Sequence, residues 1–382
     1  MGLILEYEGK ELFKKHKIPL LQSTAVKSVE EAKEASTKFS FPVAVKAQVL
    51  SGGRGKRGLI QLANSPDEVV EKAKSIIGRL DEKSGKTVSH LLIEQGADVE
   101  QELFVSMLYD RATLERMILF STEGGVEIET LAKERPEAIE HFHVPFGEKA
   151  HPYQFLSGLG KRGMKGKQKV AVARIIAALA NMMVSEDLTL AEINPLAIVK
   201  SGDVIALDAR VVTDDNAAYR HPERKNYLSE ELRYTKEELD AKNHGLAYVD
   251  LGGEIAFSSV GAGMAMATAD LIAEFGGTPK NFLDAGGGAS AEKIEETLRI
   301  MIGTEPKAIL INAFGGITKT DDVARGIIAA RGKFKTDIPM VFRLSGTNQE
   351  AALKLMKEAN LIAYDNMEES IKEVIKLSKE SR

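Results

Sequence analysis

The sequence predicts an α/β protein with two domains, and two patterns lead to this prediction. From about residue 245 onwards, strand-like runs alternate with helical segments about five times. Because such alternation with short connections is typical of a parallel sheet covered on both faces, residues 236–382 are expected to form a doubly wound sheet. Before this region, residues 1–235 combine helices and paired strands around a glycine-rich loop. The 382 residues are enough for more than one core.

Composition excludes several classes of protein. The chain is 43% hydrophobic and 28% charged, as is typical of a soluble globular protein. A net charge of −5, the absence of Trp and few aromatic residues give no basis for binding nucleic acid or an anionic membrane. The absence of cysteine excludes thiolate chemistry and suits a reducing compartment. With no signal peptide and no membrane-spanning run expected, the prediction is a cytoplasmic protein.

The first elements lead to a strand that carries one lysine. A helix over 4–17 is ended by Pro19, and a second helix begins at Ser28. The apolar run 43–48 then reads as a strand that contains Lys46. The loop that follows, residues 51–58, holds four glycines and three cations. Backbone N–H groups in such a loop can cradle phosphate, and a lysine on a rigid strand adds a point charge, so we expect a nucleoside-triphosphate site.

Two common phosphate motifs do not fit this loop. Gly53, Gly55 and Gly58 match the dinucleotide pattern GxGxxG, which needs a helix directly after it. Here residues 59–63 read as another strand, so the glycines are expected in a β-hairpin. A Walker loop is excluded because Arg57, not Ser or Thr, follows the lysine. The alternative without function is a flexible basic hairpin.

The next segments extend the first domain. Ser65 begins a helix with a capping box. Residues 81–86 are polar and are expected to form an exposed loop, whereas 91–94 form a strand and 94–97 a linker between lobes. Further predicted elements are strands at 102–109 and 117–121, a turn at 123–127 and an apolar helix at 168–186.

Oxygen-bearing side chains follow on two strands joined by a short turn. Glu192 and Asn194 are two residues apart and share one face of the run 190–196. A hairpin centred near Ser201 places Asp208 beside them. Few protein oxygens together with substrate phosphates suit Mg²⁺, which a nucleoside triphosphate normally brings with it. A solvated polar face is the alternative.

The charged segment 220–243 is expected to connect the domains. Beyond it, glycine clusters follow the first four strand-like runs, and the corresponding loops of a doubly wound sheet share the edge where ligands bind. Glycines in tight turns are the simpler alternative. No histidine or cysteine lies beyond residue 244, so a second chain would have to supply a nucleophile at this edge. The expected runs are 246–251, 281–285, 308–313, 339–344 and 362–364.

Together the motifs resemble the β subunits of the succinyl-CoA synthetase family. The likeness extends from residue 1 to about 376. Its motifs, in order, are Glu6-Tyr7-Glu8-Gly9-Lys10-Glu11-Leu12-Phe13, the Lys46 strand with Gly52-Gly53-Arg54-Gly55-Lys56, Ser121 to Glu129, Glu192-Ile193-Asn194-Pro195-Leu196, Gly261 to Met266, Asn281 to Gly288, and Phe314-Gly315-Gly316-Ile317.

The resemblance implies an ATP-grasp fold for residues 1–235, with two lobes hinged near 94–102, and a flavodoxin-like CoA-ligase domain for 236–382. It implies an acid–thiol ligase that couples succinyl-CoA and succinate to ATP or GTP. By similarity, the nucleotide is bound through its phosphates, base and ribose, and Mg²⁺ by two oxygen ligands. The implied residues are Lys46, Gly53, Arg54 and Gly55 for phosphates, Glu94 and Ala97 for the base, Glu102 for the ribose, and Asn194 and Asp208 for Mg²⁺.

The resemblance also implies a partner. An α subunit would carry CoA and a phosphohistidine, in an αβ dimer or α2β2 tetramer, and Glu192 would orient that phosphohistidine. The helix after Gly315-Gly316-Ile317 would aim its N-terminus at that phosphohistidine. The backbone N–H groups of Gly316, Ile317 and Thr318, at this helix start, are also the expected contacts of the carboxylate substrate.

Two positions depart from the family pattern. Val260 stands where the family usually has Asn, and Thr318 where Val is common. These departures leave another small carboxylate open as the substrate. A stand-alone carboxylate ligase and a nucleotide-binding regulatory module are further alternatives, although the retained Lys46, Asn194 and Asp208 argue against the regulatory module.

Overall fold

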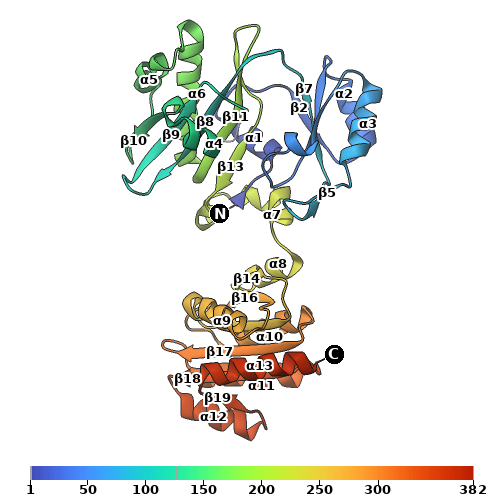
Figure 1. Cartoon of the computed structure of the whole chain (residues 1–382), viewed down its shortest axis with the longest axis vertical. Coiled ribbons are helices and arrows are strands. Elements are labelled where there is room, and N and C mark those ends of the chain that lie inside the picture. The colour runs from blue at the N-terminus through green and yellow to red at the C-terminus, as the bar shows by residue number, and fades with distance from the viewer. Residues whose placement is uncertain (1, 126–127, 382) are drawn as a thin grey trace. The chain divides into compact units, whose positions relative to one another are not determined.

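A computed structural model describes residues 2–125 and 128–381. Val126 and Glu127, which belong to the family motif Ser121 to Glu129 and to the predicted turn 123–127, lie outside the described residues. The chain divides into two compact units, with the boundary between Arg233 and Tyr234. This boundary lies inside the charged segment 220–243, between helix α7 (Leu228–Arg233) and helix α8 (Lys236–Asn243). Figure 1 shows the elements of each unit.

A four-stranded antiparallel sheet carries the Lys46 strand. Its order is β2-β7-β3-β4, and helices α2 and α3 pack together and against it (Figure 1). The side chains of Ser28 and Ser65 accept the N–H of Glu31 and Glu68, which confirms both predicted helix starts. The bounds are β2 (Ser23–Val26), α2 (Val29–Ser36), β3 (Val43–Ala47), β4 (Ile60–Ala63), α3 (Pro66–Ile76) and β7 (Leu91–Gln95).

A larger antiparallel sheet has the order β1-β13-β11-β8-β9-β10, with β12 paired to β11. Helix α1, expected over 4–17, is shorter, and the neighbouring residues contribute to the sheet or a turn. The bounds are β1 (Gly2–Leu3), α1 (Glu6–Lys15), β8 (Val99–Asp110), β9 (Glu115–Ser121), α4 (Ile128–Glu134), β10 (Glu140–Val144), α5 (Leu156–Lys161), β11 (Leu188–Val199), β12 (Val204–Ala206) and β13 (Arg210–Thr213).

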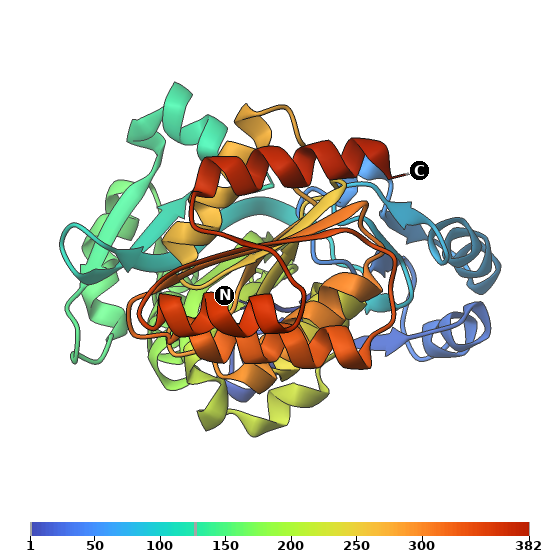
Figure 2. The ribbon, with the colours of Figure 1, turned by 90° about the horizontal axis from the view of Figure 1, so that it is seen from below.

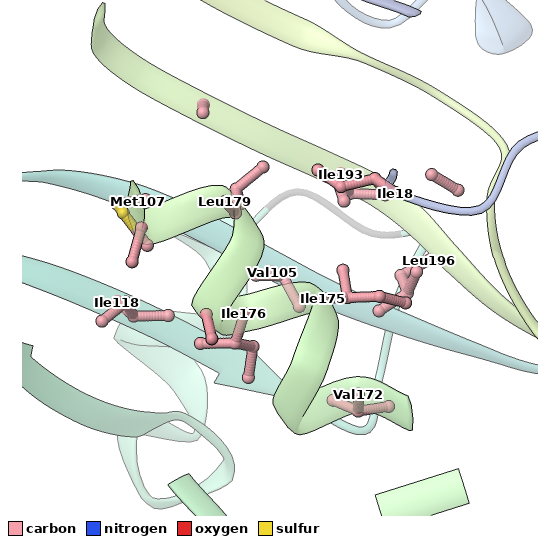
Figure 3. Packing of buried hydrophobic residues seen from close by; sticks show 14 of the residues in the cluster. Ile18, Val105, Met107, Ile118, Val172, Ile175, Ile176, Leu179, Ile193 and Leu196 are labelled. Atoms are coloured by element: carbon pink, nitrogen blue, oxygen red, sulfur yellow. The ribbon is translucent and has the colours of Figure 1, made fainter. Parts of the chain in front are cut away.

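Helix α6 (Gly166–Ser185) packs against this sheet and supplies much of its core. Figure 3 shows Ile175, Ile176 and Leu179 of α6 among apolar side chains from β8, β9 and β11. No membrane-spanning run was expected from the sequence, but α6 is long and apolar enough to cross a membrane by length and composition alone. Its place in this core accounts for its apolar character, since a helix in the core of a folded domain can be equally long and apolar.

Within residues 81–86, expected to form an exposed loop, residues 82–85 form a mostly exposed turn, whereas Asp81 and Lys86 belong to the two strands of a hairpin, β5 (Leu80–Asp81) and β6 (Lys86–Thr87). The Asp81 side chain is buried. The prediction is wrong for Asp81, because the segment is polar throughout and polarity alone does not show that a carboxylate has buried hydrogen-bond donors.

The second unit has one sheet in the order β14-β16-β15-β17-β18-β19. The strands from β16 to β19 are parallel, and counted from β15 they lie in the flavodoxin-like order 2-1-3-4-5. Helices α9 and α13 cover one face and α10, α11 and α12 the other, as Figure 2 shows. The bounds are β14 (Ala247–Asp250), β15 (Ile255–Ser259), α9 (Ala262–Glu274), β16 (Asn281–Asp284), α10 (Ala291–Gly303), β17 (Ala308–Gly315), α11 (Thr320–Lys333), β18 (Met340–Gly346), α12 (Gln349–Glu358), β19 (Ala363–Tyr364) and α13 (Met367–Glu380).

The doubly wound sheet is confirmed, with one strand more than expected. The run 246–251 is an antiparallel edge strand, β14, paired with β16. The sequence analysis missed β15, which lies inside the sheet between β16 and β17. The glycines at 252 and 253 were interpreted as a strand-to-helix turn, but they connect two strands.

Candidate functional site

The first unit contains a cavity of about 750 Å³. Much of its lining comes from the glycine-rich loop, the start of α1, and the segments around Glu192 and Asp208. Among the predicted site residues, those lining it are Gly53, Arg54, Gly55, Glu192, Asn194 and Asp208.

Lys46 lies behind the wall of this cavity. Its strand, β3, is buried along its whole length, and the lysine is only 7% exposed. Its Nζ donates to the carbonyl oxygen of Leu207 at 2.7 Å and to Oε1 of Glu6 at 2.9 Å, and it also pairs with Glu94. Burial by itself would lower the pKa of Lys46, but the neighbouring carboxylates outweigh it and raise that pKa, so the lysine is charged.

Glu6 connects Lys46 to Arg54. Its carboxylate lies 2.7 Å from Nζ of Lys10, 2.9 Å from Nζ of Lys46 and 2.6 Å from Nη1 of Arg54. Although burial opposes ionisation, the charges of Arg54, Lys10 and Lys46 hold the pKa of Glu6 well below its usual value. Glu6 also lines the cavity. It is therefore a fixed negative charge that orients the cations around it.

Arg54 extends the same array to the opposite strand. Its Nη2 lies 2.8 Å from Oδ1 of Asp208, and its Nη1 donates to the carbonyl oxygen of Ala47 at 2.9 Å. Burial acts to lower the pKa of Arg54, and Glu6 and Asp208 raise it. The buried ion array thus balances three cations against three carboxylates: Lys10, Lys46 and Arg54 against Glu6, Glu94 and Asp208.

Glu6 and Lys10 were recognised from the sequence only as part of the first family motif, without a role in the site. Both lie on α1, where Glu6, Glu8 and Lys10 are buried together with apolar side chains. The available signal was their spacing, because charges four residues apart on a helix face each other and the predicted apolar face includes the same turn.

The glycine-rich loop is open on one side. A Cβ placed on Gly52 or Gly55 would meet no atom within 4 Å. Gly53 has a φ of +74°, a conformation that favours glycine, and Gly55 begins a 3-10 turn that extends to Arg57. The loop joins two antiparallel strands, which confirms the predicted hairpin.

Glu192, Asn194 and Asp208 all line the cavity, as expected; Glu192 and Asn194 lie on β11, and Asp208 lies in the connection between β12 and β13, not on a strand. Glu192 faces Arg210 across the sheet, with Oε1 3.9 Å from Nη1. Burial raises the pKa of Glu192, Arg210 opposes this effect, and the charge of Asp208 adds to it. This carboxyl group therefore takes up a proton, or a hydrogen bond from a donor, more readily than an exposed one.

Asn194 and Asp208 offer the oxygen atoms that Mg²⁺ prefers. Oδ1 of Asn194 accepts the N–H of Gly125 at 2.8 Å, and Oδ1 of Asp208 accepts that of Ala209 at 2.9 Å. Within residues 2–125 and 128–381, no group of three or more His, Cys, Asp or Glu side chains could hold a metal ion. This donor set fits an ion that takes most of its ligands from phosphates and water, not one held by a complete protein cage.

The residues expected at the base and ribose are not among those that line this cavity. The Glu94 carboxylate pairs with Lys10 and Lys46 inside the buried ion array. Ala97 lies between β7 and β8 and is partly exposed, and Glu102 is exposed on β8, where its carbonyl oxygen accepts the N–H of Gly124 at 2.8 Å. The roles of these three residues remain predictions.

Gly316, Ile317 and Thr318 belong to the second unit, after β17 and before α11. Gly316 is exposed, Ile317 is 88% exposed, and Thr318 is buried. Oγ1 of Thr318 accepts the N–H of Gly288 at 2.8 Å, so this hydroxyl holds the neighbouring loop. These residues lie at the carboxyl edge of the parallel sheet, where doubly wound folds bind ligands.

Val260 is at the same edge. It is partly buried and packs against the core of the second unit. The N–H groups of Gly261 and Gly286 both donate to Oδ1 of Asp284 at 2.7 Å. This carboxylate therefore connects the loops that follow β15 and β16.

Comparison with known proteins matches both units. The family model of the ATP-grasp domain matches residues 3–198, and that of the CoA-ligase domain matches residues 258–375. The chain is 40% identical over 381 residues to the β subunit of the ADP-forming succinate–CoA ligase of Rubrobacter xylanophilus, covering 99% of both chains. It is 37% identical over 371 residues to the β subunit of the GDP-forming succinate–CoA ligase of Thermus thermophilus, covering 97% of both.

A solved structure has the same overall fold at low sequence identity. ATP citrate lyase from Methanothrix soehngenii, solved with citrate and coenzyme A, superimposes with a TM-score of 0.80 at 22% identity. The match covers 98% of this chain and 99% of that one. At this identity the likeness supports the fold alone.

Proposed function

This chain belongs to the family of succinate–CoA ligase β subunits, with an ATP-grasp domain followed by a CoA-ligase domain. We propose that its first unit binds the nucleotide and is the site of phosphoryl transfer to or from it. The chain is one subunit of an acid–thiol ligase that couples acyl-CoA and carboxylate to a nucleoside triphosphate. The observation that carries the proposal is the cavity in which the open glycine loop faces Glu192, Asn194 and Asp208.

The buried ion array suits this role. Arg54 lines the cavity and Lys46 lies directly behind it, so two fixed cations are available to the phosphates of ADP or ATP, or of the guanine nucleotides. Each cation already has carboxylate partners. Phosphates that enter the cavity would therefore share these cations with the carboxylates. Preorganised charges of this kind stabilise a transferring phosphoryl group without reorganisation.

Mg²⁺ would be bound at Asn194 and Asp208, where it would shield the phosphate charge. Glu192 would orient the phosphohistidine of the partner, because its raised pKa favours sharing a proton with an imidazole. The carboxylate of Asp208 also holds Arg54, so the same residue would link the metal site to the glycine loop.

The partner in this proposal is an α subunit that carries CoA and the phosphohistidine, in an αβ or α2β2 assembly in the cytoplasm. The second unit supports this requirement, because residues 245–382 contain neither histidine nor cysteine. Acyl-CoA and phosphate would give an acyl phosphate and free CoA. The partner's histidine would take the phosphoryl group from the acyl phosphate and release the carboxylate. ADP would then receive the phosphoryl group from this histidine in the cavity.

The test is to purify the chain alone and with its α partner. We expect acyl-CoA, phosphate and Mg²⁺–ADP to give ATP only when both chains are present. Turnover of carboxylate, CoA and ATP by the isolated chain would instead support a stand-alone ligase and would contradict the proposal.

A second carboxylate remains a specific alternative to succinate. Val260 offers no hydrogen-bond donor where the family usually has Asn, and it packs against the core. A less polar acid would fit such a wall better. A panel of small mono- and dicarboxylates with the complete enzyme decides between the two.

A further inference from the structure

The hairpin of β5 and β6 lies beside the glycine-rich loop. Lys83, at its turn, lines the 750 Å³ cavity. Asp81, on β5, has a fully buried side chain (0% exposed). A carboxylate so completely removed from water is costly unless donors and a cation surround it, so its partners indicate why it is there.

Those partners come from both ends of the glycine loop. Oδ2 of Asp81 accepts hydrogen bonds from Oγ of Ser51 at 2.6 Å and from Oγ of Ser84 at 2.6 Å, together with the Ser84 N–H at 3.2 Å. Oδ1 lies 3.2 Å from Nη2 of Arg57. Since Ser51 precedes the glycines and Arg57 follows most of them, one carboxylate holds the loop at both ends.

Arg57 closes the arrangement. Its Nη1 donates to the carbonyl oxygen of Gly52 at 2.7 Å, and its Nη2 donates to Oγ of Ser51 at 2.7 Å. Gly52 and Gly55 line the cavity and have open space where a Cβ would be. Asp81 and Arg57 therefore fix the loop, while its glycines leave room for a ligand in the cavity.

We propose that Asp81 is a positioning residue that holds the glycine-rich loop in the shape that receives nucleotide phosphates. The inference rests on the proposed function of the cavity. Asp81 acts only through Ser51 and Arg57. Burial opposes its ionisation, but the hydrogen bonds from Ser51 and Ser84 and the charge of Arg57 lower the pKa of Asp81, so the carboxylate remains charged at neutral pH.

The test compares Asp81→Ala and Asp81→Asn with the wild type in the complete αβ enzyme. Loss of hydrogen bonds to a charged group predicts that Asp81→Ala raises KM for Mg²⁺–ADP by about tenfold or more. Asp81→Asn keeps one carbonyl oxygen for the serines, so its KM is expected between the two. KM for CoA and for the carboxylate is expected within about twofold of wild type. Asp67→Asn, at a residue whose side chain is 91% exposed, is the matched control.

Ser84→Ala provides an independent variant in case the Asp81 variants do not fold. It removes one hydrogen bond to Oδ2 and lies outside the glycine loop. A smaller rise in KM for the nucleotide, with KM for CoA unchanged, is expected. Equal changes of KM for every substrate, or none in any Asp81 or Ser84 variant that folds, would overturn the inference.

Glu192→Gln separates this inference from the proposed function. If Glu192→Gln loses phosphoryl transfer while the Asp81 and Ser84 variants keep a normal KM for Mg²⁺–ADP, the cavity assignment stands and the role of Asp81 is wrong. If Glu192→Gln transfers phosphoryl groups normally and Mg²⁺–ADP does not protect the glycine loop from proteolysis, the cavity is not the site and both proposals are wrong.

Discussion

Replacing Glu6 by Gln tests the buried ion array, because Glu6 is its only member in contact with three cations among the described residues. The change leaves three buried cations facing two carboxylates. Breaking a buried pair costs about 3–5 kcal/mol, and the lower end applies here because Gln keeps an acceptor oxygen and Glu94 and Asp208 remain. About 3 kcal/mol corresponds to a fall in Tm of about 6–12 °C for a unit of this size.

The assay is thermal unfolding followed by circular dichroism at pH 7 and at a series of pH values below 4.5. Glu71→Gln, at an exposed position on α3, is the control. Because the folded pKa of Glu6 lies below its ordinary value of 4.5, its contribution is present above that value and is lost as the pH falls through the folded pKa. The wild type should therefore lose its advantage over Glu6→Gln on acidification. A fall in Tm no larger than that of Glu71→Gln would refute the reasoning.

Three further predictions concern the proposed site. Asp208→Asn removes a full charge from the metal pair, so the Mg²⁺ midpoint of activity should rise by at least about tenfold; an unshifted midpoint places the metal elsewhere. We expect succinate to remain the best acid in a carboxylate panel and Val260→Asn to change its KM less than about tenfold, since the backbone N–H groups at Gly316 need no side chain; a wild-type preference for a monocarboxylate, reversed by Val260→Asn, would contradict this. Burial raises the pKa of Glu192, so the wild type loses stability as pH rises through that pKa. The inactive variant Glu192→Gln should therefore have a Tm at pH 7 at least as high as that of the wild type, and a lower Tm would contradict this reasoning.

Most of the fold could be predicted from local patterns. The glycine hairpin followed from the strand 59–63 after Gly58, and both serine caps followed from their spacing to Glu31 and Glu68. The missed strand β15 has only five residues, all buried, and no alternation that would separate it from a turn. The glycines before it fit either connection, so pairing partners far along the chain decided the topology.

The site was predictable in its parts but not in its connections. Glu192, Asn194 and Asp208 could be brought together because a short hairpin fixes their register. The pairing of Lys46 with Glu6 and Glu94, and that of Asp81 with Ser51 and Arg57, joins elements distant in sequence. Such pairs leave no periodic signal, because each depends on tertiary packing.

The central claim is that the cavity is the phosphoryl-transfer site. The most direct test of this claim is to measure phosphoryl transfer by Lys46→Met. Since Lys46 pairs with buried carboxylates, the variant should be assayed beside Lys46→Met/Glu94→Gln, which removes one charge of each sign. With the α partner and labelled Mg²⁺–ATP, loss of this cation should lower kcat/KM for phosphorylation of the partner by about 30- to 1000-fold, the equivalent of about 2–4 kcal/mol. Near-normal kcat/KM in both folded variants would contradict the assignment of this cavity as the phosphoryl-transfer site.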